Sequence, residues 1–188
     1  AFSTDSFSDT KNSQINLEDA EFTFTGSGET WTIKNGTKYL MNKVNWPDTF
    51  FTDTETSMKV VKIGDTNTFK ICRADFIKDA FNVDIKDRFS NLMGYIVFYQ
   101  RGMEFRSYGT GVKDGGTHGT NPYGQHANYG ITLLEKQSAT SNDDVIPGYK
   151  TASSITSGKN YLISSVLEDG SVAVLYPDYG TMEQAKLA

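Results

Sequence analysis

The fold of this chain is decided by one stretch, Trp31-Thr32-Ile33-Lys34-Asn35-Gly36-Thr37-Lys38-Tyr39-Leu40. A β-prone approach leads into Asn35-Gly36, and a Tyr-Leu pair then starts a new strand. Asn-Gly is among the strongest hairpin signals, because both residues tolerate the positive φ of tight hairpin turns. A looser copy returns as Ile155-Thr156-Ser157-Gly158-Lys159-Asn160-Tyr161-Leu162-Ile163. The pattern predicts an all-β, repetitive architecture and gives no sign of a catalytic centre.

Further strand-like segments, separated by turn signals, extend this pattern in both directions. Short strands with a turn about every 8–12 residues are typical of barrels and sandwiches, as are many aromatic side chains. This chain has 2 Trp, 10 Tyr and 12 Phe. We therefore predict an all-β fold, a β-barrel or a β-trefoil-like or β-sandwich arrangement of hairpins. The segments are Glu21–Thr25, Met58–Ile63 with Thr68–Cys72, Gly94–Tyr99 with Met103–Tyr108, Tyr129–Glu135, and Tyr161–Val166 with Ser171–Tyr176.

Some segments depart from the strand pattern. Asp75–Arg88 places apolar residues near helical spacing and begins with a capping Asp, yet Phe81–Ile85 within it alternates as a strand does. We predict at most one short helix, followed by a strand, in this segment. Asn42–Thr56 and Gly109–Asn128 have no period and are predicted to be long loops.

Composition and charge exclude several classes of partner. A chain of 188 residues fits one domain, or one domain and a fragment of a second, and buries enough core to fold without disulfides. The single cysteine, Cys72, is predicted to be a buried core residue, as is Trp31 in its strand. The net charge of −5, with no basic run, argues against nucleic acid. No apolar stretch approaches the roughly 18–20 residues that span a bilayer, so we expect no membrane insertion.

The ends and the cysteine content suggest where the protein works. The chain lacks an initiator Met, and Lys186-Leu187-Ala188 is typical of a vector-derived tail. We expect a piece of a longer bacterial protein, extracellular or on the cell surface, because a small eukaryotic secreted domain would be richer in disulfides. The predicted parts are a polar arm (1–19), a β-barrel-like module (20–137), strands that complete it or start a second module (138–185), and the tail (186–188).

The order of the core segments adds a resemblance to these patterns. Trp31 to Leu40 comes first and Asn67–Ile71 follows mid-chain; Gly94–Tyr99, Glu104–Tyr108 and Gly130–Lys136 come next. This series resembles the non-catalytic β-trefoil or β-barrel accessory modules of large hydrolases and adhesins secreted by gut bacteria. The resemblance implies an accessory module that binds host glycans.

The side chains that carry catalysis or bind metals form no recognised constellation. The two histidines, His118 and His126, stand eight residues apart in a loop, which is not a zinc-binding pattern. No serine sits in a nucleophile elbow. Loop carboxylates remain as candidates for the two carboxyl groups of a glycosidase. Asp48, Asp53 and Glu55 are also candidate calcium ligands, although their spacing is not that of an EF-hand. The full set of loop carboxylates is Asp48, Asp53, Glu55, Asp143 and Asp144.

Two predicted loops carry the residues that suit a sugar. Trp46 offers an apolar ring beside the polar groups of Asn45 and Asp48, and sugars pack their C–H faces on rings while their hydroxyls bond to amides and carboxylates. The alternative is that Trp46 plugs the end of a barrel. Tyr123 has similar company in the Gly-rich loop, namely Asn121, Gln125 and His126.

These observations favour a non-catalytic, carbohydrate-binding module of a larger extracellular protein, with a glycan or glycoprotein as partner. This hypothesis assigns no catalytic residue, no metal and no cofactor, and expects a monomer. A protein–protein interaction domain, structural spacer or adhesin domain is the alternative, and would present an apolar patch or a sheet edge. A small hydrolase that uses the loop carboxylates ranks third.

Overall fold

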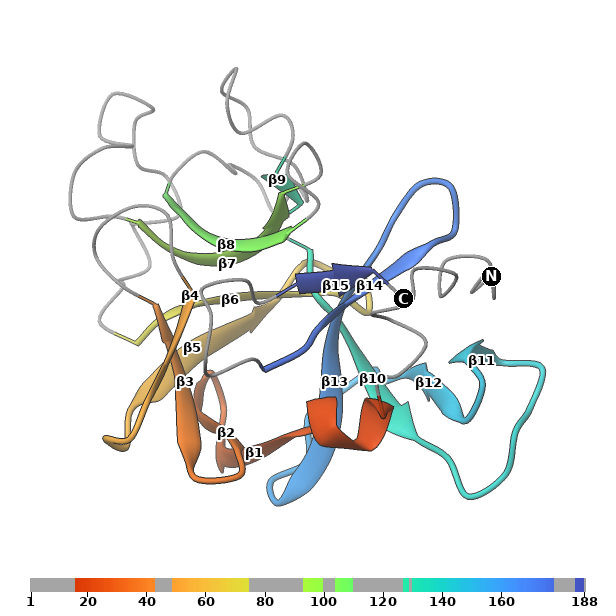
Figure 1. The fold of residues 1–188 in the computed structure, drawn as a ribbon, viewed down its shortest axis with the longest axis horizontal. Coiled ribbons are helices and arrows are strands. Elements are labelled where there is room, and N and C mark those ends of the chain that lie inside the picture. Colours follow the sequence, from red (N-terminus) through yellow and green to blue (C-terminus); the bar gives the residue numbers. More distant parts are fainter. Residues whose placement is uncertain are drawn as a thin grey trace.

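The computed structural model describes residues 16–42, 49–74, 93–99, 104–109, 127–128, 130–177 and 185–187. In these ranges the protein is an antiparallel, strongly curled half-barrel sheet with no helix of 7 or more residues (Figure 1). The predicted all-β fold is confirmed. A short 3₁₀ turn, η3 (Leu17–Ala20), precedes the first strand, and Asn16 caps it by accepting a hydrogen bond from the Glu18 N–H.

Three of the predicted hairpins form as expected: β5–β6, β7–β8 and β13–β14. The candidate helix Asp75–Arg88 lies outside the described residues. In chain order the strands are β1 (Phe22–Ser27), β2 (Thr30–Asn35), β3 (Lys38–Asn42), β4 (Thr49–Thr52), β5 (Ser57–Lys62), β6 (Phe69–Arg73), β7 (Met93–Tyr99), β8 (Glu104–Gly109), β9 (Ala127–Asn128), β10 (Thr132–Lys136), β11 (Asp144–Ile146), β12 (Tyr149–Thr151), β13 (Lys159–Val166), β14 (Val172–Leu175) and β15 (Ala185–Leu187).

All of these strands belong to one sheet. Its main path runs β11-β12-β10-β13-β1-β2-β5-β6-β7-β8, and the remaining strands attach beside it. The sheet curls so far that β6 returns to the start of β10, where Phe69 and Ile131 exchange two backbone hydrogen bonds of 2.8 Å. Because β1 pairs with β13, strands from the beginning and the end of the chain lie side by side in this sheet (Figure 1).

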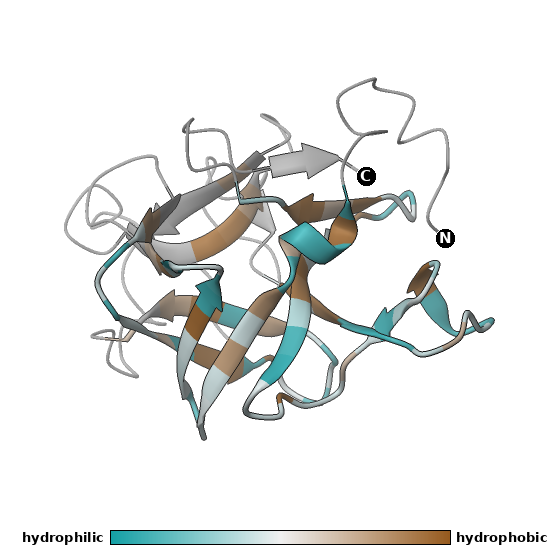
Figure 2. Cartoon of the chain, turned by 60° about the horizontal axis from the view of Figure 1, so that its bottom comes forward, coloured by the Kyte–Doolittle hydropathy of each residue, from teal (hydrophilic) through white to brown (hydrophobic). Residues whose placement is uncertain are grey.

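The core lies inside the curl because apolar residues alternate along the strands. Phe22 and Phe24 of β1 point inward, as do Trp31 and Ile33 of β2, and all four are buried. Figure 2 shows the result as bands of apolar and polar residues that alternate along the strands. The Phe24 ring meets the Tyr161 ring edge-on, with 5.4 Å between the ring centroids. The predicted burial of Trp31 and of Cys72 is confirmed.

The turn of the opening hairpin is displaced by one residue from the prediction. Asn35 still pairs with Lys38, so the two turn residues are Gly36 and Thr37, not Asn35 and Gly36. Gly36 supplies the positive φ, +56°, at the first turn position. The Asn35 side chain instead bonds to the preceding segment, where its Nδ2 donates to the carbonyls of Asp19 and Glu21, at 2.9 and 2.8 Å. Asn35 thereby ties the turn η3 to the hairpin.

The predicted loops are shorter than the sequence suggested. β4 (Thr49–Thr52) pairs with β3 inside the predicted loop Asn42–Thr56. β9 forms at the end of the predicted loop Gly109–Asn128 and pairs with β7. The hairpin β11–β12 follows the polar connector 138–144. These strands have four, two and three residues, too few for a period of two to stand out from their neighbours.

Candidate functional site

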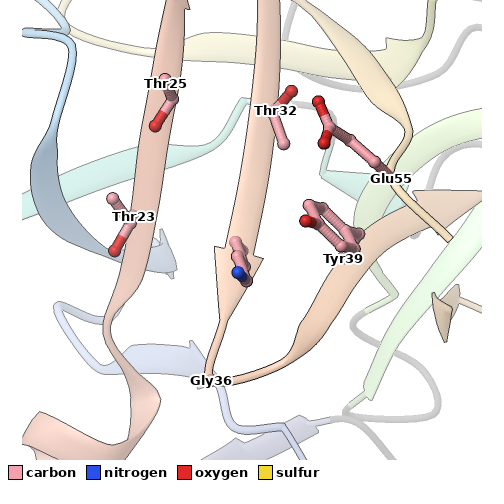
Figure 3. A pocket seen from close by; sticks show the side chains of 7 residues that line it. Thr23, Thr25, Thr32, Gly36, Tyr39 and Glu55 are labelled. Atoms are coloured by element: carbon pink, nitrogen blue, oxygen red, sulfur yellow. The ribbon is translucent and has the colours of Figure 1, made fainter. Parts of the chain in front are cut away.

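A crevice of about 450 Å³ opens on the outer face of the sheet, where β2 changes partner. One edge of β2 pairs with β1, while its other edge pairs with β5 through Thr30–Thr32 and with β3 through Lys34 and Asn35. β3 and β5 therefore diverge beside β2, and Glu55, between β4 and β5, comes to this fork (Figure 3). The lining residues are Thr23, Thr25, Thr32, Lys34, Gly36, Tyr39 and Glu55.

The strand period decides which side chains reach the crevice. Since Phe22 and Phe24 point inward, Thr23 and Thr25 must point outward from β1. On β2, Thr32 and Lys34 point outward by the same rule. On β3, Leu40 is buried, so its neighbour Tyr39 points outward. The crevice is thus the polar reverse side of the strands that supply the core.

The crevice combines a ring, hydroxyls and one charge of each sign. Lys34 and Tyr39 are register partners on β2 and β3, and the Lys34 ammonium lies 5.2 Å from the centroid of the Tyr39 ring. This cation–π contact holds the ring in place. Figure 3 shows the Glu55 carboxylate pointing toward Thr32, with Thr23 and Thr25 on the other side of β2. Such a lining offers both hydrogen-bond donors and acceptors beside an aromatic surface.

Beside the crevice, a chain of hydrogen bonds runs from β1 across β13 into the hairpin β11–β12. Thr23 Oγ1 donates to Asn160 Oδ1 at 2.7 Å, and Asn160 Nδ2 donates to Glu21 Oε2 at 3.3 Å. The hydroxyl of Tyr149, a residue that is 5% exposed, donates to Glu21 Oε1 at 2.7 Å in a partly buried hydrogen bond. Burial, and then the hydrogen bond to Glu21, raise the pKa of Tyr149 far above its ordinary value. The phenol therefore stays protonated and remains a donor.

The sugar-binding residues predicted from sequence all lie outside the described residues, so these predictions stay untested. They are Trp46, Asn45, Asp48, Tyr123, Asn121, Gln125 and His126, and His118 lies outside as well.

Three of the loop carboxylates that the structure describes have different surroundings. Asp53 pairs with Lys38 at 2.7 Å, while Glu55 lines the crevice. Asp144 accepts hydrogen bonds from the N–H groups of Ser141 and Gly148, at 3.0 and 2.8 Å, and these bonds lower its pKa. Asp144 is therefore a turn-stabilising residue. Among the described residues, no three His, Cys, Asp or Glu side chains gather as a metal site would require.

The crevice residues were missed because each looks ordinary in sequence. Thr, Lys and Tyr at alternating strand positions are typical of any half-exposed sheet. The signal was nevertheless present in the stretch that decides the fold, because its polar positions, Thr32, Lys34 and Tyr39, had to share the outer face once the apolar ones were assigned to the core. The fork that hollows this face depends on β4, which the sequence did not predict, and on the change of partner along β2 from β5 to β3.

A second hollow, of about 880 Å³, lies at the opposite end of the β1–β2 hairpin. Its floor is formed by Trp31, Val60 and Phe69, and the loop of residues 153–157 borders it. These three floor residues are apolar core side chains, so this hollow differs from the polar crevice in composition.

Comparison of the chain with protein-family profiles, with curated proteins and with solved structures finds no match. The resemblance to accessory modules of secreted hydrolases accordingly stays a prediction. No helix in the described part of the chain has the length and apolar character needed to cross a bilayer.

Proposed function

We propose that this protein is a non-catalytic carbohydrate-binding module of a larger extracellular bacterial protein, and that the crevice on β1–β3 binds the sugar. One observation carries the proposal: the half-buried Tyr39 ring is set among three threonine hydroxyls, an ammonium and a carboxylate. Sugars pack their C–H faces on such rings, while their hydroxyls need donors and acceptors at the edge of the ring.

The dimensions and the charges of the crevice support the same proposal. Its volume of about 450 Å³ lies within the usual range of small-molecule sites, about 300–1,000 Å³. Glu55 is the one carboxylate among its described lining residues. Glycoside hydrolysis ordinarily needs two carboxyl groups across the scissile bond, so the described lining favours binding over hydrolysis.

The test is a glycan-array screen followed by calorimetry on the sugar that binds most tightly. We expect Tyr39→Ala to weaken binding about tenfold or more, since ring stacking contributes about 0.5–1.5 kcal/mol beyond the buried area. Thr37→Ala is the matched control, because Thr37 lies in the turn of the same β2–β3 hairpin, is exposed, and does not line the crevice.

Two outcomes would contradict the proposal in different ways. If the folded protein binds no glycan, the function is wrong. If it binds a glycan that Tyr39→Ala leaves untouched and Trp46→Ala abolishes, the function stands, but the site belongs to the loop predicted from sequence.

A further inference from the structure

We propose that the crevice selects neutral sugars over anionic ones, because the row of hydrogen bonds beside it fixes the Thr23 hydroxyl as an acceptor toward the ligand. This inference rests on the proposed function and names the class of sugar bound. It depends on the order Tyr149–Glu21–Asn160–Thr23, in which each group determines the role of the next.

Glu21 determines which group donates and which accepts in each of these hydrogen bonds. An ionised carboxylate only accepts hydrogen bonds, so Asn160 must turn its NH₂ group toward Glu21 Oε2, which lies 3.3 Å from Nδ2. The amide carbonyl then faces Thr23, its register partner on the neighbouring strand β1. A carbonyl oxygen only accepts, so the Thr23 hydroxyl donates to it, at 2.7 Å.

Tyr149 keeps Glu21 in this role. Its hydroxyl donates to Glu21 Oε1 at 2.7 Å, and only 5% of the residue is exposed. Tyr149 packs in a buried cluster with Ile146 and Leu162, so the position of its hydroxyl is determined by the core. In this series of hydrogen bonds, Tyr149 at one end is buried, and Thr23 at the other end lines the crevice.

With its proton committed to Asn160, Thr23 offers the ligand lone pairs only. Its register partner on the other side is Lys34 of β2, whose ammonium only donates. Sugar hydroxyls suit both groups, because a hydroxyl can accept from the Lys34 ammonium, which lies over the Tyr39 ring, and can donate to Thr23. A carboxylate or sulfate oxygen satisfies Lys34 but faces the Thr23 lone pairs without a proton to give. Glu55, across the crevice, repels the same anions.

The test compares neutral glycans with their charged counterparts. The probe is an array that holds neutral oligosaccharides beside the same structures bearing a sulfate or a uronic acid, followed by calorimetry of the tightest pair. We expect the unmodified protein to prefer the neutral member about tenfold or more. Thr23→Val should weaken binding of the neutral member about three- to tenfold, and Thr23→Ser should restore it.

Glu21→Gln tests the chain itself. A glutamine offers either a carbonyl or an NH₂ group, which frees Asn160 to turn over and Thr23 to donate outward, so the preference for neutral glycans should shrink about three- to tenfold. Glu135→Gln is the matched control, because it removes the same charge on β10, where Glu135 accepts from Lys159 at 2.6 Å and takes no part in the chain. Thermal melting of each variant verifies that it is folded.

The inference and the proposed function fail separately. A protein that binds sugars but prefers the anionic members, or a folded Thr23→Val protein with unchanged affinity, overturns the inference alone. Equal selectivity in Glu21→Gln and Glu135→Gln overturns it as well. A protein that binds no member of the array overturns the proposed function.

Discussion

The two hollows that flank the β1–β2 hairpin are built from opposite sides of the sheet. The crevice near Gly36 is lined by outward-pointing polar side chains. The larger hollow, near Gly28, has a floor of Trp31, Val60 and Phe69, none of them more than 5% exposed. Its floor therefore consists of core side chains, whereas the crevice is lined by polar ones. We base the proposed site on the chemistry of the lining, not on volume, since the crevice is the smaller of the two hollows.

Hydrogen bonds from backbone and side-chain groups hold the loop at the larger hollow in place. The loop that borders it is held at several points: Ser157 Oγ accepts from the Gly26 N–H at 3.1 Å, and the Ser153 carbonyl accepts from Lys62 Nζ at 2.9 Å. The Gly158 N–H donates to the Phe24 carbonyl at 2.8 Å. Changes at this end should therefore alter stability, whereas changes in the crevice should alter binding.

The largest expected effect comes from Gly26→Ala, at the larger hollow. A Cβ on Gly26, whose φ is +155°, would stand 2.2 Å from the Thr30 carbonyl oxygen across the hairpin. The backbone of both strands must move, so we expect the free energy of unfolding to fall by about 3 kcal/mol or more, measured by urea denaturation.

Gly28→Ala is the control for that change, because its φ is also positive, +59°, but a Cβ there meets nothing within 4 Å. Gly28→Ala should lower the free energy of unfolding by only about 1–2 kcal/mol, which is the cost of placing alanine in a left-handed backbone conformation. Equal losses for the two variants would show that the contact with Thr30 does not matter.

Two tyrosines make the next comparison, one on each side of the sheet. Tyr161 is buried, and its hydroxyl accepts from the Thr156 N–H at 2.8 Å. Tyr161→Phe leaves that donor without its partner and should lower the free energy of unfolding by about 1–2 kcal/mol. Tyr39→Phe, in the crevice, should change it by less than about 0.5 kcal/mol. A larger loss from Tyr39→Phe would mean that the crevice is part of the stabilising framework.

The same division between the two faces explains what sequence could predict. Strand segments and core residues follow from the period of two, as Phe22, Phe24, Trp31 and Ile33 show. The turn of the opening hairpin was displaced because Asn35 is held by its side-chain bonds to Asp19 and Glu21. The pattern of residues around Asn35 does not indicate that its side chain bonds to the segment that follows η3 and to η3 itself.

The candidate site was less predictable than the fold, because it depends on long-range pairing. Thr23 meets Asn160 only because β1 pairs with β13, 137 residues away in the chain. The crevice likewise forms because the first half of β2 pairs with β5 and its end pairs with β3 along the same edge. The sequence pattern favoured a loop with an exposed aromatic ring, while the described part of the structure places a ring on a strand.

Thr25→Val and Thr32→Val should separate binding from stability with a smaller effect. Both side chains point outward, and valine keeps the β-branched shape that strands favour. We expect the free energy of unfolding to change by less than about 0.5 kcal/mol, while sugar affinity measured by calorimetry falls about three- to tenfold for each variant. A loss of stability above about 1 kcal/mol, with affinity unchanged, would reverse the roles assigned to the two hollows.

The last prediction concerns the hydrogen bonds beside the crevice, and the expected effect diminishes at alkaline pH. The pKa of Tyr149 is raised in the folded protein, whereas in the unfolded chain its phenol titrates near its ordinary value of about 10. The stability that the protonated phenol contributes is therefore fully present below pH of about 10 and is lost as the pH rises from there toward the folded-state pKa. Tyr149→Phe should be less stable than the unmodified protein at pH 8, and the difference should shrink between about pH 10 and 12 in urea denaturation. A difference that stays constant over this range would mean that Tyr149 ionises alike in both states, and that Glu21 does not hold its proton in place.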